Sequence, residues 1–273
     1  MLILLTNDDG ILAPGLLAMY RELVKLGEVG VVAPESVQSA TGHGITITTP
    51  LLTSPVTVGE ENGFTGTAVD GRPADCVKLA VAKLLPRPPD LVVSGINAGA
   101  NVGINVIYSG TVAAAIEAAF LGLPSVAVSL YLRRDVPADY AQAAAHARRT
   151  IEQILEAGLA PGQVASINLP ALHPGQAPAG TRVARQCVRP WPDTYEERKD
   201  PRGRSYYWNS SVFTLGDHED DTDVVDLRNG YITVTPLHFD LTHYPMLRQW
   251  QERGAWPGDQ GATRAGRAGG ERR

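Results

Sequence analysis

The chain has few cysteines and no long apolar run, and both absences limit what it can be. Its 273 residues include only Cys76 and Cys187, too few for a disulfide framework and without the spacing of a zinc site. No stretch approaches the roughly 18 apolar residues of a membrane span, and the first residues lack the basic flank and apolar centre of a secretory signal. We therefore expect a cytoplasmic protein that does not enter a membrane.

Positive charge is also scarce. Lys and Arg number 24 against 29 Asp and Glu, which gives a formal net charge of -5, and no basic stripe occurs before the extreme C-terminus. A nucleic-acid polymer is therefore not expected as a partner. The common nucleotide motifs are missing as well, because there is no Gly-x4-Gly-Lys-Ser/Thr loop, and Gly42-His43-Gly44 lacks the rest of a dinucleotide-binding pattern.

An acidic run in the C-terminal third has the density of a calcium loop, but it has neither the spacing nor the closing glutamate of one. We interpret it as a solvated run of charges. Its members are Asp217, Glu219, Asp220, Asp221, Asp223 and Asp226.

What the sequence does contain is an alternation of short apolar runs with helical periods. This pattern is typical of a parallel sheet covered by helices on both faces. We predict an α/β fold with a Rossmann-like, doubly wound, mainly parallel sheet over residues 1–180, and a hairpin insertion with strands at 45–49 and 56–58. The expected core strands are 2–6, 29–33, 90–94, 124–130 and 163–169.

Beyond residue 170 the sequence becomes richer in proline, glycine and aromatic residues. We predict a β-rich extension over residues 181–257 and a disordered tail over 258–273, which is rich in Gly, Arg and Ala. Exposed strand edges invite pairing with another chain. The extension is therefore expected to mediate assembly into a homodimer or homotetramer.

Two adjacent carboxylates, Asp8 and Asp9, directly follow the first apolar strand. The crevice beyond the carboxyl ends of parallel strands is where ligands bind. Adjacent carboxylates repel each other unless a cation shares them, and Mg²⁺ prefers such oxygen ligands. The pair therefore indicates half of a metal site, although a solvated Asp-Asp-Gly turn that caps the next helix explains it about equally well.

A second constellation follows the strand at 90–94. Residues 94–103 form a loop rich in glycine and asparagine, in which Asn side chains offer neutral oxygen ligands and glycines let the backbone approach an anion. The loop leads into Ser109, Gly110 and Thr111 at the start of an Ala-rich helix. A helix N-terminus binds phosphate readily, and with this loop before it we favour that role over plain N-capping by Ser109.

A third segment, residues 33–44, follows the second strand and belongs at the same rim. Within it Ser39 is either a further metal ligand or a turn cap. His43 is more often a solvated or hydrogen-bonded residue in such a loop, but near a phosphate it is a candidate general acid.

Taken together, these segments resemble the SurE survival-protein family. The resemblance lies in residues 6–10 (Thr-Asn-Asp-Asp-Gly), 38–42 (Gln-Ser-Ala-Thr-Gly), 94–103 (Ser-Gly-Ile-Asn-Ala-Gly-Ala-Asn-Val-Gly), 108–112 (Tyr-Ser-Gly-Thr-Val) and 230–237 (Gly-Tyr-Ile-Thr-Val-Thr-Pro-Leu). It covers nearly the whole chain except the tail, and the order of the motifs makes it specific. It implies a SurE-like fold whose C-terminal extensions build swapped dimers and often tetramers.

The resemblance also implies an activity, a 5'-nucleotidase that depends on one divalent cation per subunit, Mg²⁺ or Mn²⁺. Its substrates would be nucleoside 5'-monophosphates and also 3'-monophosphates, with polyphosphate as a further candidate, and its products nucleoside and phosphate. The implied site residues are Asp8, Asp9, Ser39 and Asn97 for the metal, Asn101, Ser109, Gly110 and Thr111 for the phosphate, and Asp8 as the catalytic group.

Two positions depart from the family pattern, Arg72 in place of a threonine and Ala118 in place of a glycine. Neither is an implied ligand, and Arg72 is a candidate for altering the entrance to the site. The rival hypothesis is a non-catalytic, magnesium-dependent phosphate- or nucleotide-binding module of the receiver type. A receiver needs a carboxylate at the end of its central strand, and residues 94–97 (Ser-Gly-Ile-Asn) provide none.

Overall fold

The computed structural model describes residues 1–173, 175–189, 194–209, 215 and 221–253. Within them, nine strands form one sheet in the order β3-β4-β2-β1-β5-β6-β7-β11-β8, and β9 pairs with β10 in a separate hairpin. The strands are β1 (Leu2–Thr6), β2 (Glu28–Pro34), β3 (Thr53–Val58), β4 (Phe64–Val69), β5 (Leu91–Ala98), β6 (Ser125–Leu130), β7 (Val164–Leu169), β8 (Thr181–Val183), β9 (Tyr195–Lys199), β10 (Ser205–Asn209) and β11 (Ile232–Leu237).

The sheet is mainly parallel, as predicted. Strands β4, β2, β1, β5, β6 and β7 pair in parallel, while β3 and β11 each run antiparallel to their neighbours β4 and β7. The strands of the parallel core are apolar and buried along nearly their whole length, which is expected where helices cover both faces. The α/β class is therefore confirmed.

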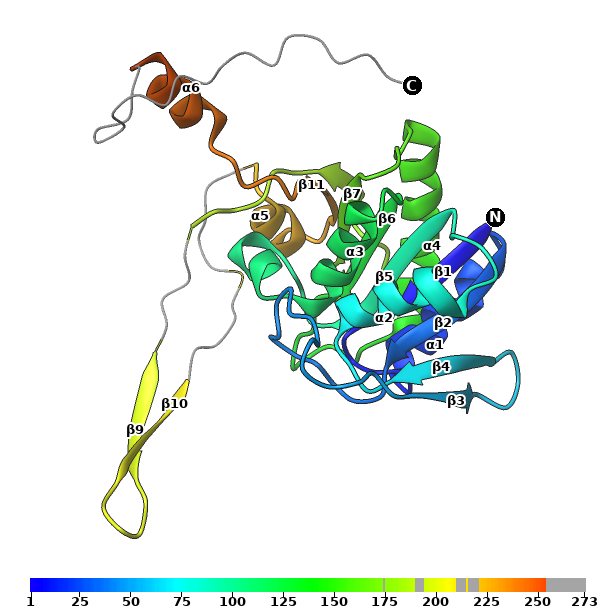
Figure 1. Ribbon diagram of the computed structural model, residues 1–273, viewed down its shortest axis with the longest axis horizontal. Coiled ribbons are helices and arrows are strands. Elements are labelled where there is room, and N and C mark those ends of the chain that lie inside the picture. The colour runs from blue at the N-terminus through cyan, green and yellow to red at the C-terminus, as the bar shows by residue number, and fades with distance from the viewer. Residues whose placement is uncertain (174, 190–193, 210–214, 216–220, 254–273) are drawn as a thin grey trace. The chain divides into compact units, whose positions relative to one another are not determined.

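Helices lie on both faces of the sheet (Figure 1). On one face α1 packs beside α4, and on the other α2 packs beside α3. The helices are α1 (Pro14–Leu23), α2 (Pro73–Leu79), a π-helical turn η1 (Ala80–Leu84), a 3₁₀ turn η2 (Gly103–Ile107), α3 (Gly110–Phe120), α4 (Tyr140–Ala157), α5 (Asp223–Arg228) and α6 (Tyr244–Glu252).

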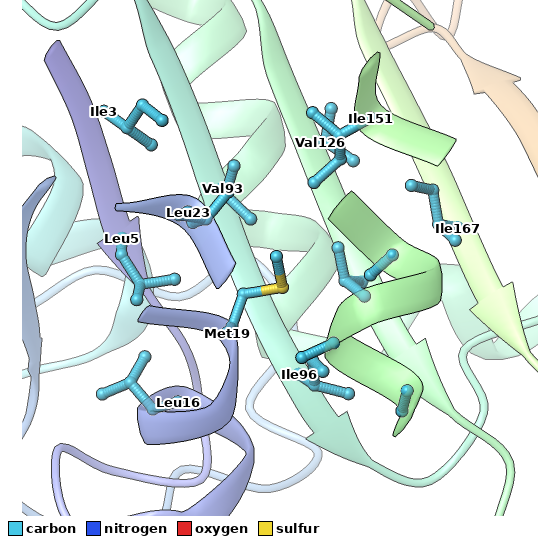
Figure 2. Packing of buried hydrophobic residues seen from close by; sticks show 14 of the residues in the cluster. Ile3, Leu5, Leu16, Met19, Leu23, Val93, Ile96, Val126, Ile151 and Ile167 are labelled. Atoms are coloured by element: carbon cyan, nitrogen blue, oxygen red, sulfur yellow. The ribbon is translucent and has the colours of Figure 1, made fainter. Parts of the chain in front are cut away.

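Figure 2 shows how the core forms on the α1/α4 face. Alternate residues of each strand point to this face, and they meet the apolar stripes of the two helices. Side chains from four strands and from both helices interdigitate there without exposure to solvent. The labelled members are Ile3, Leu5, Leu16, Met19, Leu23, Val93, Ile96, Val126, Ile151 and Ile167.

The expected hairpin differs from the observed one. Residues 45–49 form no strand, and β3 pairs with β4 instead. The buried carboxylate of Asp75 accepts the Thr46 N–H with both oxygens, at 3.0 and 3.1 Å, and holds this segment against the start of α2.

The C-terminal part of the chain contributes to the central sheet through β8 and β11. The described chain divides into one compact unit, Met1–Leu237, and a second that begins at His238 and contains α6. The expected tail at 258–273 lies outside the described residues. No helix among the described residues has the length and apolar character needed to cross a membrane.

Candidate active site

The site lies at the carboxyl ends of β1 and β5, which are parallel neighbours at the centre of the sheet. From β1 the chain crosses to β2 on one side and reaches β5 on the other, so a crevice opens where the strand order reverses. A cavity of about 690 Å³ occupies this place. Its lining residues are Asp8, Asp9, Ser39, Ala40, Asn97, Ala98, Asn101, Ile104, Asn105, Tyr108, Ser109 and Asn209.

Asp8 lies at the buried base of this cavity, with only 5% of its surface exposed. Its Oδ1 accepts the Thr111 hydroxyl at 2.5 Å, and its Oδ2 accepts the Thr111 N–H at 3.1 Å. Burial raises the pKa of Asp8 to about 6, and the neighbouring charge of Asp9 adds to the rise, while the bonds from Thr111 oppose it. The negative charge of Asp8 is thus only partly compensated by protein groups.

Asp9 and Asn97 face the cavity from adjacent strand ends. Asp9 Oδ2 accepts the Ala98 N–H at 2.8 Å, and burial raises the pKa of Asp9 as well. The Asn97 side chain donates from Nδ2 to the Gly99 carbonyl at 2.8 Å. Because that bond uses the amide nitrogen, the amide oxygen of Asn97 is the group left for a ligand.

Ser39 reaches the same cavity from the loop after β2. The Gln38 N–H donates to the Asp8 carbonyl at 2.7 Å, and the Gly42 N–H donates to the Tyr108 carbonyl at 3.1 Å. These two bonds hold the loop across the strand ends on both sides of Ser39. The structure therefore brings all four predicted metal-ligand candidates to one cavity.

The donors fit a hard divalent cation. They are two carboxylates, one amide oxygen and one hydroxyl, and oxygen ligands of this kind suit Mg²⁺ or Mn²⁺ better than Zn²⁺. Within the part of the chain that the structure describes, no group of three or more His, Cys, Asp or Glu side chains offers a rival metal site. Burial raises the pKa of both carboxyl groups, and the charge of Asp9 raises the pKa of Asp8 further, so a bound cation would relieve both costs.

Ser109, which precedes α3, also lines the cavity, whereas Gly110 and Thr111 of this helix are not among the lining residues. Ser109 caps the helix, because its Oγ accepts the Val112 N–H at 3.1 Å, and its own hydroxyl proton is free to be donated. Both donors of Thr111 are directed at Asp8, as described above. Among the described residues nothing accepts the Gly110 N–H, which leaves this group and the Ser109 hydroxyl as the donors for an anion.

Gly110 is required by the close approach of α3 to β1. A Cβ at this position would lie 2.9 Å from the Cβ of Asp8 and 3.0 Å from its Oδ2. Both distances are shorter than a Cβ normally tolerates. The absence of a side chain at residue 110 therefore lets the helix N-terminus reach the carboxylate.

Asn101 lines the cavity and is fixed by residues that the sequence did not suggest. Its N–H donates to Asn168 Oδ1 at 2.8 Å, and its carbonyl accepts from Asn168 Nδ2 at 3.2 Å. Its own Nδ2 donates to the Ser129 hydroxyl at 2.9 Å. One of the two amide protons of Asn101 is thereby used inside the protein.

His43 and Arg72 are not among the residues that line the cavity. His43 Nε2 lies 2.8 Å from Glu117 Oε2, and Lys78 donates to the other oxygen of the same carboxylate at 3.1 Å. Arg72 packs over Gly44, where a Cβ would meet its guanidinium. His43 therefore contacts Glu117 of α3, and Arg72 contacts the loop before β3.

The expectation of a solvated acidic run was wrong for Asp223 and Asp226. Both are buried, with 1% and 6% exposure: Asp223 accepts the Gly103 N–H from the loop that follows β5, and Asp226 pairs with Arg182 of β8. Asp221 is exposed, and Asp217, Glu219 and Asp220 lie outside the described residues. The sequence did contain one indication of a helix beginning at Asp223, because threonine, here Thr222, is a preferred residue at the position before a helix.

Known proteins of one family resemble this chain along about nine tenths of its length. The model of the family described as survival protein SurE matches residues 3–193. A 5'-nucleotidase SurE from Syntrophobacter fumaroxidans is 48% identical over 248 residues, which are 90% of this chain and 97% of that protein. A 5'-nucleotidase SurE from Nitratidesulfovibrio vulgaris strain DP4 is 50% identical over 243 residues, 89% of this chain and 95% of that protein. The crystal structure of the SurE protein from Aquifex aeolicus superposes with a TM-score of 0.78 at 36% identity and covers 93% of this chain and 99% of that one.

Proposed function

This chain belongs to the SurE survival-protein family, and on that premise we propose that it is a metal-dependent 5'-nucleotidase. It hydrolyses the phosphomonoester bond of nucleoside monophosphates and releases nucleoside and phosphate. The relatives whose names state this activity align with about nine tenths of the chain.

One structural observation carries the proposal, namely the bonding of both Asp8 oxygens to Thr111. This contact joins the oxygen donors at the strand ends to the N-terminus of α3. A cation site and an anion site then lie side by side in one cavity. That is the arrangement that a phosphomonoester needs, because its phosphoryl group carries the charge that both must stabilise.

We assign the metal to Asp8, Asp9, Ser39 and Asn97, with one Mg²⁺ or Mn²⁺ per subunit. When bound, such a cation neutralises phosphoryl charge and lowers the pKa of water. The bonds from Thr111 and Ala98 fix the two carboxylates before any ligand arrives, so the ligand geometry is set in advance.

The remaining steps belong to side chains and backbone groups. The Ser109 hydroxyl and the Gly110 N–H bind non-bridging oxygens of the phosphoryl group, and Asn101, which lines the same cavity, presents its second amide proton. Asp8 accepts the proton of the attacking water on one of its carboxylate oxygens, and the departing nucleoside oxygen takes up a proton from solvent as its bond to phosphorus breaks. Asp8 is therefore the catalytic group in this proposal. Thr111 orients Asp8 rather than the substrate.

The rival function, a non-catalytic phosphate-binding module, finds no support at the strand end where a receiver carries its phosphorylated carboxylate. Asn97 occupies the corresponding end of β5. An amide cannot be phosphorylated in that way, but it can donate an oxygen lone pair to a metal. The end of β5 therefore offers no carboxylate on which a receiver-type module could store a phosphoryl group.

A panel of substrates tests the proposal. Recognition centres on the phosphoryl group, so several nucleoside 5'-monophosphates should be hydrolysed, with 3'-monophosphates and short polyphosphate as further substrates. Bis(p-nitrophenyl) phosphate should be a poor substrate, because its second ester removes the terminal charge that α3 binds. Phosphate release is measured with Mg²⁺, with Mn²⁺ and with chelator. Preference for the diester, or full activity in chelator, would contradict the assignment.

Assembly and location are further parts of the proposal. We propose a homodimer or homotetramer whose contacts are made by the β-rich extension at 181–257, where Tyr195, Tyr207 and Trp208 of the β9–β10 hairpin are exposed. Cytoplasmic placement stays a prediction of the low cysteine content. Both cysteines are buried in the structure.

A further inference from the structure

Asp223, the first residue of α5, is a buried carboxylate that binds three backbone groups. Its Oδ2 accepts the Gly103 N–H at 2.8 Å. Its Oδ1 accepts the N–H groups of Cys187 and Val224, both at 2.9 Å. With 1% exposure, this carboxylate is satisfied by main-chain donors from three separate parts of the chain.

Gly103 is held through both of its backbone groups. While Asp223 accepts its N–H, the Gln186 side chain donates to its carbonyl at 2.8 Å. Gly103 has a φ of 58°, a conformation that glycine adopts without strain. It is the first residue of η2, which carries Ile104 and Asn105 into the lining of the cavity.

The segment between Asn101 and Ser109 is therefore held in place at two points, Asn101 and Gly103. Asn168 of β7 holds Asn101 from within the sheet. Asp223 and Gln186 hold Gly103 from the C-terminal part of the chain. Apolar contacts support the second anchor, because Val102 packs in a buried cluster with Cys187, Val224 and other residues of that part. The path from Gly103 then leads through η2 to Ser109, the residue that caps α3.

The same carboxylate also accepts hydrogen bonds from Cys187 and Val224, which lie on the two sides of the β9–β10 hairpin segment in the sequence. Cys187 precedes that segment and Asp223 follows it. A parallel bridge between Arg185 and Thr222, with the Asp223 N–H donating to the Arg185 carbonyl at 3.0 Å, holds these two ends together. The hairpin segment and the cavity loop thus share one buried attachment point.

We propose that Asp223 is a positioning residue for the phosphate-binding loop, and that through it the ends of the hairpin segment are coupled to the active site. The inference rests on the proposed function, since it assigns the loop a role in binding phosphate. Asp223 does not touch the substrate. It fixes the backbone of Gly103, and through η2 it fixes the place at which Ser109 and Gly110 meet the phosphoryl group.

Asp223→Asn is the decisive variant. If the amide oxygen keeps the Cys187 and Val224 donors, the amide nitrogen faces the Gly103 N–H and that bond is lost. Asp226→Asn is the matched control, because Asp226 is buried on the same helix but pairs with Arg182 of β8 at 2.6 Å instead of the loop. Gln186→Ala removes the bond to the Gly103 carbonyl and supplies the test if the first variant does not fold.

Three measurements on the full chain are compared, namely Mn²⁺ binding, inhibition by inorganic phosphate at saturating Mn²⁺, and hydrogen exchange of peptides from residues 101–110. In Asp223→Asn we expect phosphate binding to weaken roughly tenfold or more, as after loss of a hydrogen bond to a charged group, with Mn²⁺ affinity changed by less than about twofold. Exchange in 101–110 should accelerate. Asp226→Asn should change neither phosphate binding nor exchange there.

Unchanged phosphate binding in Asp223→Asn, or an equal loss in Asp226→Asn, would overturn the proposal. A parallel loss of Mn²⁺ binding would overturn it too, because a general collapse of the site would then explain the effect. Failure of the proposed function gives a different result, namely no metal-dependent phosphate release by the unaltered protein. Hydrogen exchange at 101–110 still decides the positioning role in that case.

Discussion

Asp8→Asn is the substitution that most directly tests the active site, because it removes the charge of this side chain and keeps its shape. The amide oxygen can still accept the Thr111 N–H. The Thr111 hydroxyl can rotate and accept a hydrogen bond from the new amide nitrogen. Both hydrogen bonds between residue 8 and Thr111 in the unaltered protein can therefore be replaced in the variant. We therefore expect the fold to survive and the cation to lose one of its two anionic ligands.

The magnitudes follow from the burial of Asp8. Its pKa rises from 3.8 to about 6, so keeping it ionised without a metal costs the fold up to about 3 kcal/mol at neutral pH. The metal-free variant should be more stable than the metal-free parent by up to this amount. Its activity should fall by roughly two or more orders of magnitude, as on loss of a principal metal or catalytic group.

The raised pKa of Asp8 also predicts the direction in which the stability of the metal-free protein changes with pH. The pKa of Asp8 in the folded state lies above its unfolded value, so the metal-free parent binds the proton more tightly than the unfolded chain does. Its free energy of unfolding should decrease as the pH rises from about 4 to about 6 and level off above that. The variant should lack this component.

Urea unfolding in chelator from pH 4 to 8 measures the stability, and phosphate release across a Mn²⁺ titration measures the activity. Asp135→Asn serves as the control, since it neutralises an exposed carboxylate that pairs with Arg133 and should change neither quantity measurably. Near-normal turnover of Asp8→Asn at saturating Mn²⁺ would refute the assignment of this residue.

Three further outcomes are expected. Gly110→Ala would place a Cβ 2.9 Å from that of Asp8, so kcat/KM should fall roughly tenfold or more, and a fully active variant would show that α3 need not approach so closely. Light scattering at micromolar concentration should give a dimer or tetramer that persists when the chain is truncated after Gly258; a monomer would contradict the assembly proposal. His43→Gln should keep a hydrogen bond to Glu117 and leave kcat within about threefold, whereas a loss of one limb of the pH profile would restore His43 as the general acid.

The strand ends of the site could be predicted from the sequence because the information is local. An acidic pair directly after an apolar run, and a Gly/Asn loop after another, both lie at the carboxyl edge in any parallel sheet. The hydrogen bonds that hold this edge of the sheet in place join residues far apart in the sequence. Asn168 binds Asn101, 67 residues away in the sequence, and Asp223 binds Gly103, 120 residues away. Contacts at such separations produce no repeating pattern of residues from which they could be predicted.

The errors have the same origin. The sequence of residues 45–49 alternates as a strand would, but a strand also needs a partner edge, and β4 pairs with β3 instead. The acidic run has the composition of a solvated segment, yet each buried member has a specific partner. Asp223 has main-chain donors and Asp226 has Arg182. Composition averages over neighbours in sequence, whereas burial depends on neighbours in space.

The hydrogen bonds that complete the site also set when it can form during synthesis. Asp8 and Asp9 leave the ribosome first, but the donors that fix them, Thr111 and Ala98, follow 103 and 89 residues later. At a translation rate of about 5–20 residues per second, that delay is on the order of 5 to 20 s. Through this interval the emerging chain exposes a carboxylate pair that no other part of the protein yet holds, so a cation captured early would be held by flexible ligands and readily exchanged.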